Sequence, residues 1–251
     1  MSIHTIPNNY QPSQNLLQGK NILITGAGDG IGRCAALSFA AHGASVILLG
    51  KTEEKLASVY DEIESNGWPQ PALIPLDLNT SDYNQYLTVK KAVEEHIGCL
   101  HGLLHNAGIL GQRTTIADSK PEDWLKVMQV NINSVFLLTK ALLPALSHDE
   151  KSSIVMTSSG VGRKGRAYWG AYSVSKFATE GLMQVLADEM SLTNIRVNCI
   201  NPGATRTRMR AQAYPAENPL DLPTPEQLMT TYLYLMGGDS HAENGKTFDA
   251  Q

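Results

Sequence analysis

The sequence predicts one α/β domain in which a parallel sheet of about seven strands is doubly wound, with helices covering both of its faces. Two observations support this prediction. Short apolar runs alternate with longer amphipathic stretches, which is typical of repeated strand and helix units. The chain also has 251 residues, of which 42% are hydrophobic, and these values allow one large domain with a sizeable core.

Residues 1–18 are predicted to be an N-terminal extension of a single domain that spans 19–251. The extension is polar, contains two prolines and lacks an apolar core, so it does not resemble a signal peptide. Cys34, Cys99 and Cys199 are odd in number and widely spaced, which indicates thiols in a reducing compartment rather than a disulfide framework or a metal cluster. No run approaches the roughly 18 apolar residues of a membrane span, so we expect a cytoplasmic protein.

Each predicted strand is a short apolar run, and each predicted helix is a longer amphipathic stretch. The strands are expected at residues 21–25, 45–49, 72–75, 102–105, 153–157, 196–200 and 246–249. The helices are expected at residues 31–42, 53–66, 82–97, 121–146, 172–191 and 225–237. Residues 205–225 carry four prolines and show no strand pattern, so we interpret this segment as a mobile flap over the substrate.

The connection between the first strand and the first helix is rich in glycine. Glycines allow the backbone to approach a pyrophosphate closely, and the N-terminus of the helix presents free N–H groups and a positive dipole end. An isolated match of this kind could also be an ordinary strand-to-helix loop. We interpret the connection as the phosphate-binding turn of a dinucleotide site. It contributes Gly26, Gly28, Asp29, Gly30, Ile31 and Gly32.

The ends of the next three strands continue this predicted site, because open α/β sheets bind ligands at the carboxyl ends of their strands. Lys51 follows the second strand, where no acid is present to hold the adenosine ribose, and this favours NADP(H) over NAD(H). Asp77, followed by Leu78, could accept a hydrogen bond from the adenine amino group. Taken singly, such residues are more often solvated lysines and turn residues. The fourth strand is followed by Asn106, Ala107 and Gly108.

Tyr172 and Lys176 are predicted to form the reactive pair of this site. Residues four apart on a helix share one face, so the ammonium can lie close to the phenol. A phenol titrates near ~10 and a neighbouring positive charge favours the phenolate, so such a pair can exchange protons near neutral pH. With a hydroxyl donor at Ser159 and a dinucleotide nearby, these residues suit hydride transfer to or from a carbonyl.

Five motifs, in order and at matching spacing, resemble those of the short-chain dehydrogenase/reductase family over almost the whole chain. They are Thr-Gly-x3-Gly-x-Gly at 25–32, the Asn-Asn-Ala-Gly element at 105–108, the helix asparagine Asn131, Ser-x12-Tyr-x3-Lys at 159–176 and Pro-Gly-x3-Thr at 202–207. Segments 162–166, 169–172 and 246–251 resemble the YciK-like bacterial branch of the family most closely. The resemblance implies a Rossmann-type fold and an NAD(P)-dependent oxidoreductase that acts on CH-OH donors.

The resemblance also implies a role for each matched residue. Tyr172 is the proton donor in reduction and the acceptor in oxidation, Lys176 lowers the tyrosine pKa and binds the nicotinamide ribose, and Ser159 stabilises the substrate oxygen. Asn131 holds a water on the proton path toward Lys176. The loop after the sixth predicted strand fixes the carboxamide, so that the pro-S hydrogen is transferred. Its residues are Pro202, Gly203, Thr205 and Thr207.

Neighbouring residues compete for three of these positions. Tyr168 is not preferred as the catalytic tyrosine, because the residue four positions later is Tyr172 and not a lysine. The spacing to the tyrosine selects Ser159 over the adjacent Ser158, and the family position selects Asn131 over Asn133. Without the other motifs, such an asparagine could equally be a buried residue that bridges backbone groups.

Two positions depart from the family pattern, and one cluster has no assigned role. His105 replaces the usual first asparagine, and Asp29 stands where some NADP-dependent relatives carry a basic residue. A cluster of basic residues could bind an anionic substrate or the cofactor phosphates, although a solvated loop or an interface patch is the weightier interpretation. The cluster consists of Arg163, Lys164, Arg166, Arg206, Arg208 and Arg210.

The leading hypothesis is an NADP(H)-dependent carbonyl reductase or alcohol dehydrogenase. A non-catalytic NADP(H)-binding regulator of the same fold is the alternative, although such proteins generally lose the tyrosine or the lysine. An epimerase or dehydratase of the extended branch generally carries a longer C-terminal domain. The net charge of -4 argues against nucleic-acid and membrane partners, so we expect a small carbonyl or alcohol substrate. The family resemblance implies a homodimer or homotetramer, with helices 121–146 and 172–191 pairing across the interface.

Overall fold

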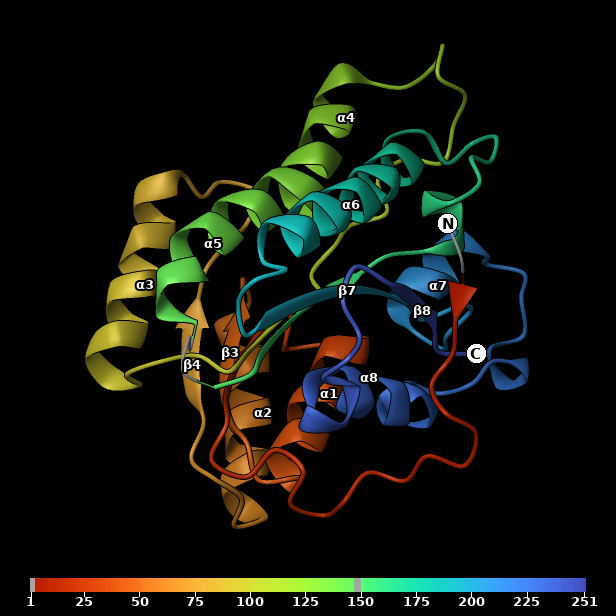
Figure 1. Cartoon of the computed structure of the whole chain (residues 1–251). Coiled ribbons are helices and arrows are strands. Elements are labelled where there is room, and N and C mark those ends of the chain that lie inside the picture. Colours follow the sequence, from red (N-terminus) through yellow and green to blue (C-terminus); the bar gives the residue numbers. More distant parts are fainter. Residues whose placement is uncertain (1–2, 147–149) are drawn as a thin grey trace.

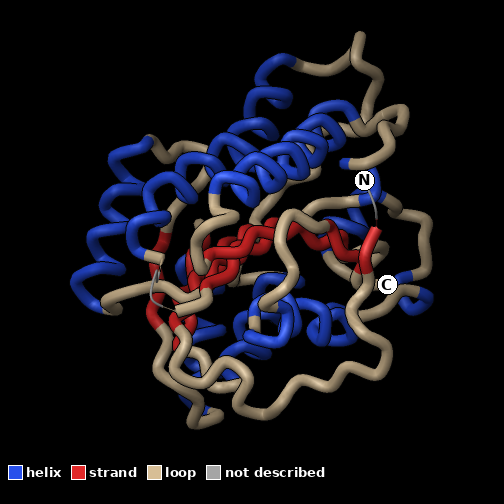
Figure 2. The backbone as a smooth tube through the Cα atoms, viewed as in Figure 1, coloured by secondary structure: helices blue, strands red, loops and turns tan. Residues whose placement is uncertain are grey.

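The computed structural model describes residues 3–146 and 150–251, which form one eight-stranded sheet flanked by helices. All neighbouring strands are parallel, in the order β1-β8-β7-β6-β5-β2-β3-β4. The strands form a central layer with helices on either side (Figure 2). This arrangement confirms the predicted doubly wound α/β fold, with one strand more than the approximate number expected from the sequence.

The strands agree with the predicted runs to within a few residues at each end. Their bounds are Ile3–His4 for β1, Asn21–Thr25 for β2, Ser45–Gly50 for β3, Ala72–Pro75 for β4, Gly102–His105 for β5, Ser152–Thr157 for β6, Ile195–Asn201 for β7 and Thr247–Asp249 for β8. The longer helices are α1 Gly30–Ala41, α2 Glu53–Ser65, α3 Tyr83–His96, α4 Pro121–Met128, α5 Ser134–Leu142, α6 Gly170–Glu189, α7 Arg208–Ala213 and α8 Met229–Met236. No helix in these described ranges is both long and apolar enough to cross a membrane.

The sheet separates two hydrophobic cores, because successive strand residues point to opposite faces. On β2, Leu23 packs into the core that α3, α5 and α6 cover, whereas Ile22 and Ile24 pack into the core that α1, α2 and α8 cover. Figure 1 shows these two groups of helices on opposite faces of the sheet. Both faces of the central strands are therefore buried, which explains why the strands are continuous apolar runs rather than alternating ones.

The N-terminal segment contributes the eighth strand, which the sequence did not reveal. Ile3 pairs with Thr247 and His4 with Phe248, so β1 lies along β8 at the edge of the sheet. A strand of two residues carries no measurable periodicity, and its position depends on β8, which is more than 240 residues away in the chain.

The helix predicted at 121–146 is interrupted in the middle. A π-helical turn at Gln129–Asn133 separates α4 from α5, and a 3-10 turn at Leu143–Ala145 follows α5. Such single π turns are frequent at functional sites, because the extra residue redirects the side chains around it. This turn carries Asn131.

Residues 205–225 contain more regular structure than the sequence suggested. Thr207 caps α7, since its hydroxyl accepts a hydrogen bond from the backbone N–H of Arg210 at 3.2 Å. The Arg206 guanidinium donates to the carbonyl oxygens of Pro219, Leu220 and Leu222, and so ties the two ends of the segment together. The segment is therefore cross-linked by hydrogen bonds within itself.

Candidate active site

A cleft of about 850 Å³ opens at the carboxyl ends of the strands. Within the sheet, β3 and β4 lie on one side of β2, and the chain then crosses to β5 on the other side of β2. The point between β2 and β5 is therefore a topological switch point. Crevices at such points are the usual ligand sites of open α/β sheets. The fold thus places this cleft where the sequence predicted a dinucleotide site.

The cleft brings together nearly all of the predicted site residues. Those of the predicted cofactor site that line it are Gly26, Gly28, Asp29, Gly30, Ile31, Lys51, Asp77, Leu78, Asn106, Ala107, Gly108, Tyr172, Lys176, Pro202, Gly203, Thr205 and Thr207. Ser159 lines it as well. Two predicted residues, Gly32 and Asn131, do not line the cleft and lie behind its wall.

The glycine-rich turn is shaped for close backbone packing. Gly26 has a φ of +69° and Gly30 one of +52°, backbone angles that residues other than glycine rarely adopt. A Cβ atom at Gly32 would collide with the carbonyl oxygen of Gly26, so this residue allows α1 to approach the turn. Asp29, the N-cap residue of α1, makes no side-chain capping bond, and Gly30 and Ile31 at the start of the helix line the cleft.

The loop after β5 is held against this turn by the hydroxyl of Thr25. Its oxygen accepts hydrogen bonds from the backbone N–H groups of Asn106 and Ala107, each at 3.0 Å. His105, just before them, is 3% exposed and contacts the Thr139 hydroxyl at 2.8 Å. Burial lowers the pKa of His105 to about 3, so this imidazole is neutral at pH 7 and faces the core rather than the cleft.

Basic and acidic groups gather at the end of the cleft near β3. Lys51 lines it, and Lys55 forms an ion pair with Asp29. The hydrogen bond from Lys55 lowers the pKa of Asp29, and the charge of Arg208 acts in the same direction. Because Lys55 neutralises Asp29, the departure from the family pattern at this position leaves no uncompensated negative charge beside Lys51.

Tyr172 and Lys176 lie together on the first turns of α6. The Lys176 Nζ atom is 5.7 Å from the centre of the Tyr172 ring and donates a hydrogen bond to the carbonyl oxygen of Thr157 at 2.7 Å. Burial lowers the pKa of Lys176 to about 8, so its ammonium is still mostly charged at pH 7. The spacing of the two residues in the sequence thus brings the groups onto one helix face, as predicted.

The pKa of Tyr172 differs from the expectation. Burial raises it, while a hydrogen bond with the Ser159 hydroxyl acts in the opposite direction. The sequence predicted that the charge of Lys176 would lower this pKa, but the pKa is raised overall, because desolvation of the phenol outweighs the effects that favour the phenolate. The phenol is therefore protonated at neutral pH and can act as a donor.

Asn131 supports the site from the π turn. Its Oδ1 atom accepts a hydrogen bond from the backbone N–H of Ile109 at 2.8 Å, and its Nδ2 atom donates to the Ile109 carbonyl at 2.9 Å and to the Ser175 hydroxyl at 3.1 Å. A Cβ atom at Gly108 would lie 3.4 Å from Asn131 Oδ1 and 3.8 Å from Lys176 Nζ. Asn131 therefore holds the loop after β5 beside the lysine.

The competing residues have different surroundings. Tyr168 is 56% exposed, with a φ of +70°, and lines no part of the cleft. Ser158 is 1% exposed and also lines the cleft, so the spacing to Tyr172 and the contact with the phenol distinguish Ser159 from it. Asn133 is exposed and does not line the cleft, and its amide donates a hydrogen bond to the side chain of Gln129 at 3.2 Å.

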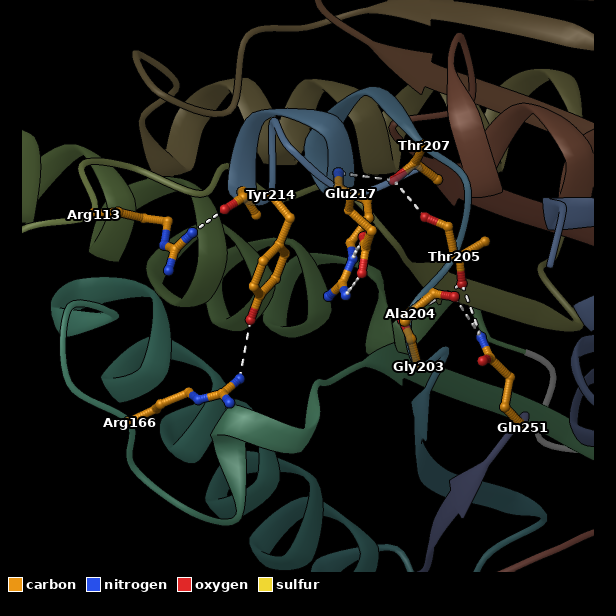
Figure 3. A network of polar contacts seen from close by, with 11 residues as sticks. Arg113, Arg166, Gly203, Ala204, Thr205, Thr207, Tyr214, Glu217 and Gln251 are labelled. Carbon is orange, nitrogen blue, oxygen red and sulfur yellow. Dashed lines mark hydrogen bonds and ion pairs between the residues drawn. The ribbon is translucent and has the colours of Figure 1, made fainter. Parts of the chain in front are cut away.

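Aromatic and arginine side chains close the cleft beyond Tyr172. The Trp169 ring centre lies 5.7 Å from that of Tyr172, and the Arg113 guanidinium packs over both Trp169 and Tyr214 at 4.8 and 4.9 Å from their ring centres. Arg113, labelled in Figure 3, donates a hydrogen bond to the carbonyl oxygen of Ala213, so α7 is fastened to the loop before α4. The sequence motifs assign these residues no site role, because their proximity results only from folding.

The loop after β7 is held by the last residue of the chain. The side-chain amide of Gln251 donates to the carbonyl oxygen of Pro202 at 2.5 Å. It also donates to the carbonyl oxygen of Ala204 and to the Thr205 hydroxyl, each at 3.3 Å (Figure 3). Gly203, with a φ of +71°, lies within this loop. These contacts fix the wall of the cleft that faces Tyr172.

Comparison with known proteins identifies relatives over most of the chain. The family pattern described as short chain dehydrogenase matches residues 20–218. The oxidoreductase YciK of Escherichia coli K12 is 52% identical over 242 residues, which cover 96% of each protein. The 3-oxoacyl-[acyl-carrier-protein] reductase FabG of Thermotoga maritima is 37% identical, with 77% of each protein covered.

Solved structures agree with these sequence matches. A short chain dehydrogenase from Salmonella enterica serovar Typhi superposes with a TM-score of 0.95 at 54% identity, covering 96% of this chain and 100% of the other. A protein from Escherichia coli CFT073, solved in complex with NADPH, has a TM-score of 0.93 at 53% identity, covering 96% and 100%. The predicted resemblance to the YciK-like branch is thereby confirmed.

Proposed function

This chain belongs to the short-chain dehydrogenase/reductase family of oxidoreductases, and from that premise we propose that it interconverts a carbonyl and a secondary alcohol with NADP(H) as cofactor. One observation carries the proposal: a single cleft is lined by the glycine-rich turn, by Ser159 and by the pair Tyr172 and Lys176. A nucleotide-binding protein without catalytic function would have no need for these three side chains beside its nucleotide.

The residues of the cleft fit a nicotinamide dinucleotide. The uncapped N-terminus of α1 and the close backbone packing at Gly32 suit a pyrophosphate, and we assign the adenosine end to Lys51 and Asp77. At the other end, Thr205 and Thr207 would hold the carboxamide. When bound, NADPH supplies the hydride.

The chain's own groups would move the proton and stabilise charge. Tyr172 donates its phenolic proton to the carbonyl oxygen during reduction and takes it back during oxidation. The Ser159 hydroxyl, already in contact with the phenol, stabilises the charge that develops on the same oxygen. The Lys176 ammonium, held by Thr157, favours the phenolate that remains. We assign Asn131 the role of holding the backbone beside Lys176 through Ile109.

The preference for NADP(H) rests on Lys51, and it can be tested by replacing that residue. We expect Lys51→Ala to weaken NADPH binding about 10- to 100-fold, since a charged hydrogen bond contributes about 1.5–3 kcal/mol. NADH binding should change by less than about threefold, because NADH carries no 2′-phosphate. Fluorescence titration with both cofactors measures the difference. The NADPH bound to the Escherichia coli CFT073 relative favours the same choice.

Lys91→Ala is the matched control for this experiment. Lys91 lies on α3 with its side chain 73% exposed and pairs only with Glu95 in the described part of the chain. This variant should bind both cofactors as the unaltered protein does. Equal losses of NADPH and NADH affinity in Lys51→Ala would contradict the assignment of the phosphate to Lys51.

We also propose that the chain forms a homodimer or homotetramer through the outer face of α6. Val174, Phe177 and Val185 are 43%, 43% and 58% exposed. Their spacing places them with Gly181 in one stripe along the helix, and a Cβ atom at Gly181 would meet nothing within 4 Å. Phe136 on α5 adds a further exposed ring, at 48%. A symmetric partner helix would bury this apolar stripe.

Sedimentation at micromolar concentration tests the oligomer. The unaltered protein should sediment as a dimer or tetramer, and Phe177→Glu should dissociate it, because the interface would then bury an unpaired carboxylate. Leu192→Glu is the control, since Leu192 is 99% exposed in the turn after α6 and lies outside the stripe. A monomeric unaltered protein would contradict the proposal.

We retain the flap and the cellular location as proposals. Residues 205–225 lie over the end of the cleft through Thr207, Met209 and Ala213, which suits a segment that encloses the substrate. Cys34 and Cys199 are free and buried, which suits a protein of the reducing cytoplasm.

A further inference from the structure

A second cavity, of about 440 Å³, continues from the catalytic end of the cleft. Both cavities are lined by Ser159, Trp169, Gly203 and Arg210, so the two meet beside the catalytic serine. Beyond this junction the second cavity is lined by Lys164, Arg166 and Tyr214. A substrate with its carbonyl at Ser159 can therefore extend into a cavity that is lined by basic side chains.

The contacts of the basic cluster separate structural arginines from available ones. Arg163 donates to Asp249 at 2.6 Å and is largely buried, so it is part of the fold. Arg206 is used by loop carbonyls, and Arg210 forms a two-pronged ion pair with Glu217, both bonds at 2.6 Å. In the ranges 3–146 and 150–251, no carboxylate forms an ion pair with Lys164 or Arg166.

Arg166 is held in a defined position despite its exposure. One of its terminal nitrogens donates to the Tyr214 hydroxyl at 3.0 Å (Figure 3). The Tyr214 ring is itself held by two guanidinium groups, at 4.9 Å for Arg113 and 3.9 Å for Arg210. The guanidinium of Arg166 is thus held in one orientation while its remaining N–H groups stay available to an anion, as a preorganised anion site requires.

The charge of this cavity contrasts with that of the whole protein. The chain carries a net charge of -4, yet among the described residues no aspartate or glutamate lines the second cavity. Glu217 compensates only Arg210, which leaves the positive charges of Lys164 and Arg166 facing the cavity. We propose that this cavity binds the acidic group, a carboxylate or a phosphate, of a carbonyl substrate whose reacting oxygen lies at Ser159. This inference rests on the proposed function and specifies its substrate class.

Matched pairs of compounds test the proposal with the full chain. Each pair consists of an anionic carbonyl compound and its neutral counterpart: 4-oxopentanoate with its methyl ester, longer keto acids with theirs, and dihydroxyacetone phosphate with dihydroxyacetone. Binding is measured calorimetrically on the protein loaded with NADP+, and turnover by consumption of NADPH. At least one anionic compound should bind, and be reduced, tenfold or more better than its counterpart. The acid and phosphate arms distinguish the two kinds of anion.

The variant Lys164→Gln/Arg166→Gln should lose this preference. Its KM for the anionic member of a pair should rise about 10- to 100-fold with little change in kcat, and its KM and kcat for the neutral member should change little. Tyr214→Phe removes the hydroxyl that holds Arg166 but keeps both charges, so most of the preference should remain. Lys91→Gln is the surface control. Equal binding of both members of every pair, or a preference that survives in the double variant, would overturn the proposal.

The binding measurement separates this inference from the proposed function. If anionic compounds bind preferentially but Tyr172→Phe turns them over normally, the anion site is supported and the assignment of Tyr172 as proton donor is wrong. If Tyr172→Phe abolishes turnover while anionic and neutral members bind equally well, the proposed reaction is supported and the proposed anion site is wrong.

Discussion

Tyr172→Phe is expected to lower kcat for carbonyl reduction about 10²- to 10⁴-fold, which is the range that a positioned general acid contributes. The substitution removes one hydroxyl from a ring that is packed beside Trp169, so the shape of the cleft is preserved. In the unaltered protein burial raises the pKa of this phenol further, so it is available at neutral pH as the proton donor that we propose, beside Ser159. Initial rates of NADPH consumption on the best carbonyl substrate measure the effect.

Tyr168→Phe is the control, because it makes the same chemical change four residues earlier at an exposed ring that does not line the cleft. This variant should retain the activity of the unaltered protein. Tyr172→Phe should bind NADPH within about threefold of the unaltered protein, since a single neutral hydrogen bond contributes little. Equal turnover by Tyr172→Phe and the unaltered protein would refute the assignment, whichever substrate is used.

Lys176→Met is expected to have the second largest effect, a fall of about 10²- to 10³-fold in kcat together with weaker NADPH binding. Methionine keeps the length and the apolar stem of the side chain but removes the ammonium that lies beside the Tyr172 ring. Stability should change little, because loss of the bond to Thr157 is offset by relief from burying a charge. Thermal unfolding and initial rates, measured together, distinguish loss of chemistry from loss of fold.

The pH dependence provides an independent check on Lys176. Its folded pKa, lowered to about 8, means that the ammonium loses its proton as the pH rises through 8. If carbonyl reduction requires this charge, kcat/KM should fall above pH 8 in the unaltered protein. Lys176→Met should be slow throughout and lack this inflection. A fall near pH 8 that persists in the variant would assign the titration to another group.

The candidate site could be predicted from the sequence to the extent that its parts follow single strands or one helix. Each strand end supplies ligands to the same edge of a parallel sheet, so Lys51, Asp77 and Asn106 could be grouped from their positions after successive apolar runs. Tyr172 and Lys176 could be paired from their spacing alone. The position of Asn131 behind the cleft could not be predicted, because the π turn that carries it leaves no trace in the hydrophobic pattern.

The sequence by itself determined the positions of β2 to β8, the glycine-rich turn and the shared face of Tyr172 and Lys176, because each depends on periodicity or spacing within one short segment. Tertiary structure decided which basic residues are available. The charge of Arg163 is paired with Asp249, 86 positions away, whereas the Arg166 side chain is held only by the hydroxyl of Tyr214, 48 positions away, among the contacts of the described residues. It also decided the direction of the Tyr172 pKa, since desolvation depends on everything that surrounds the phenol.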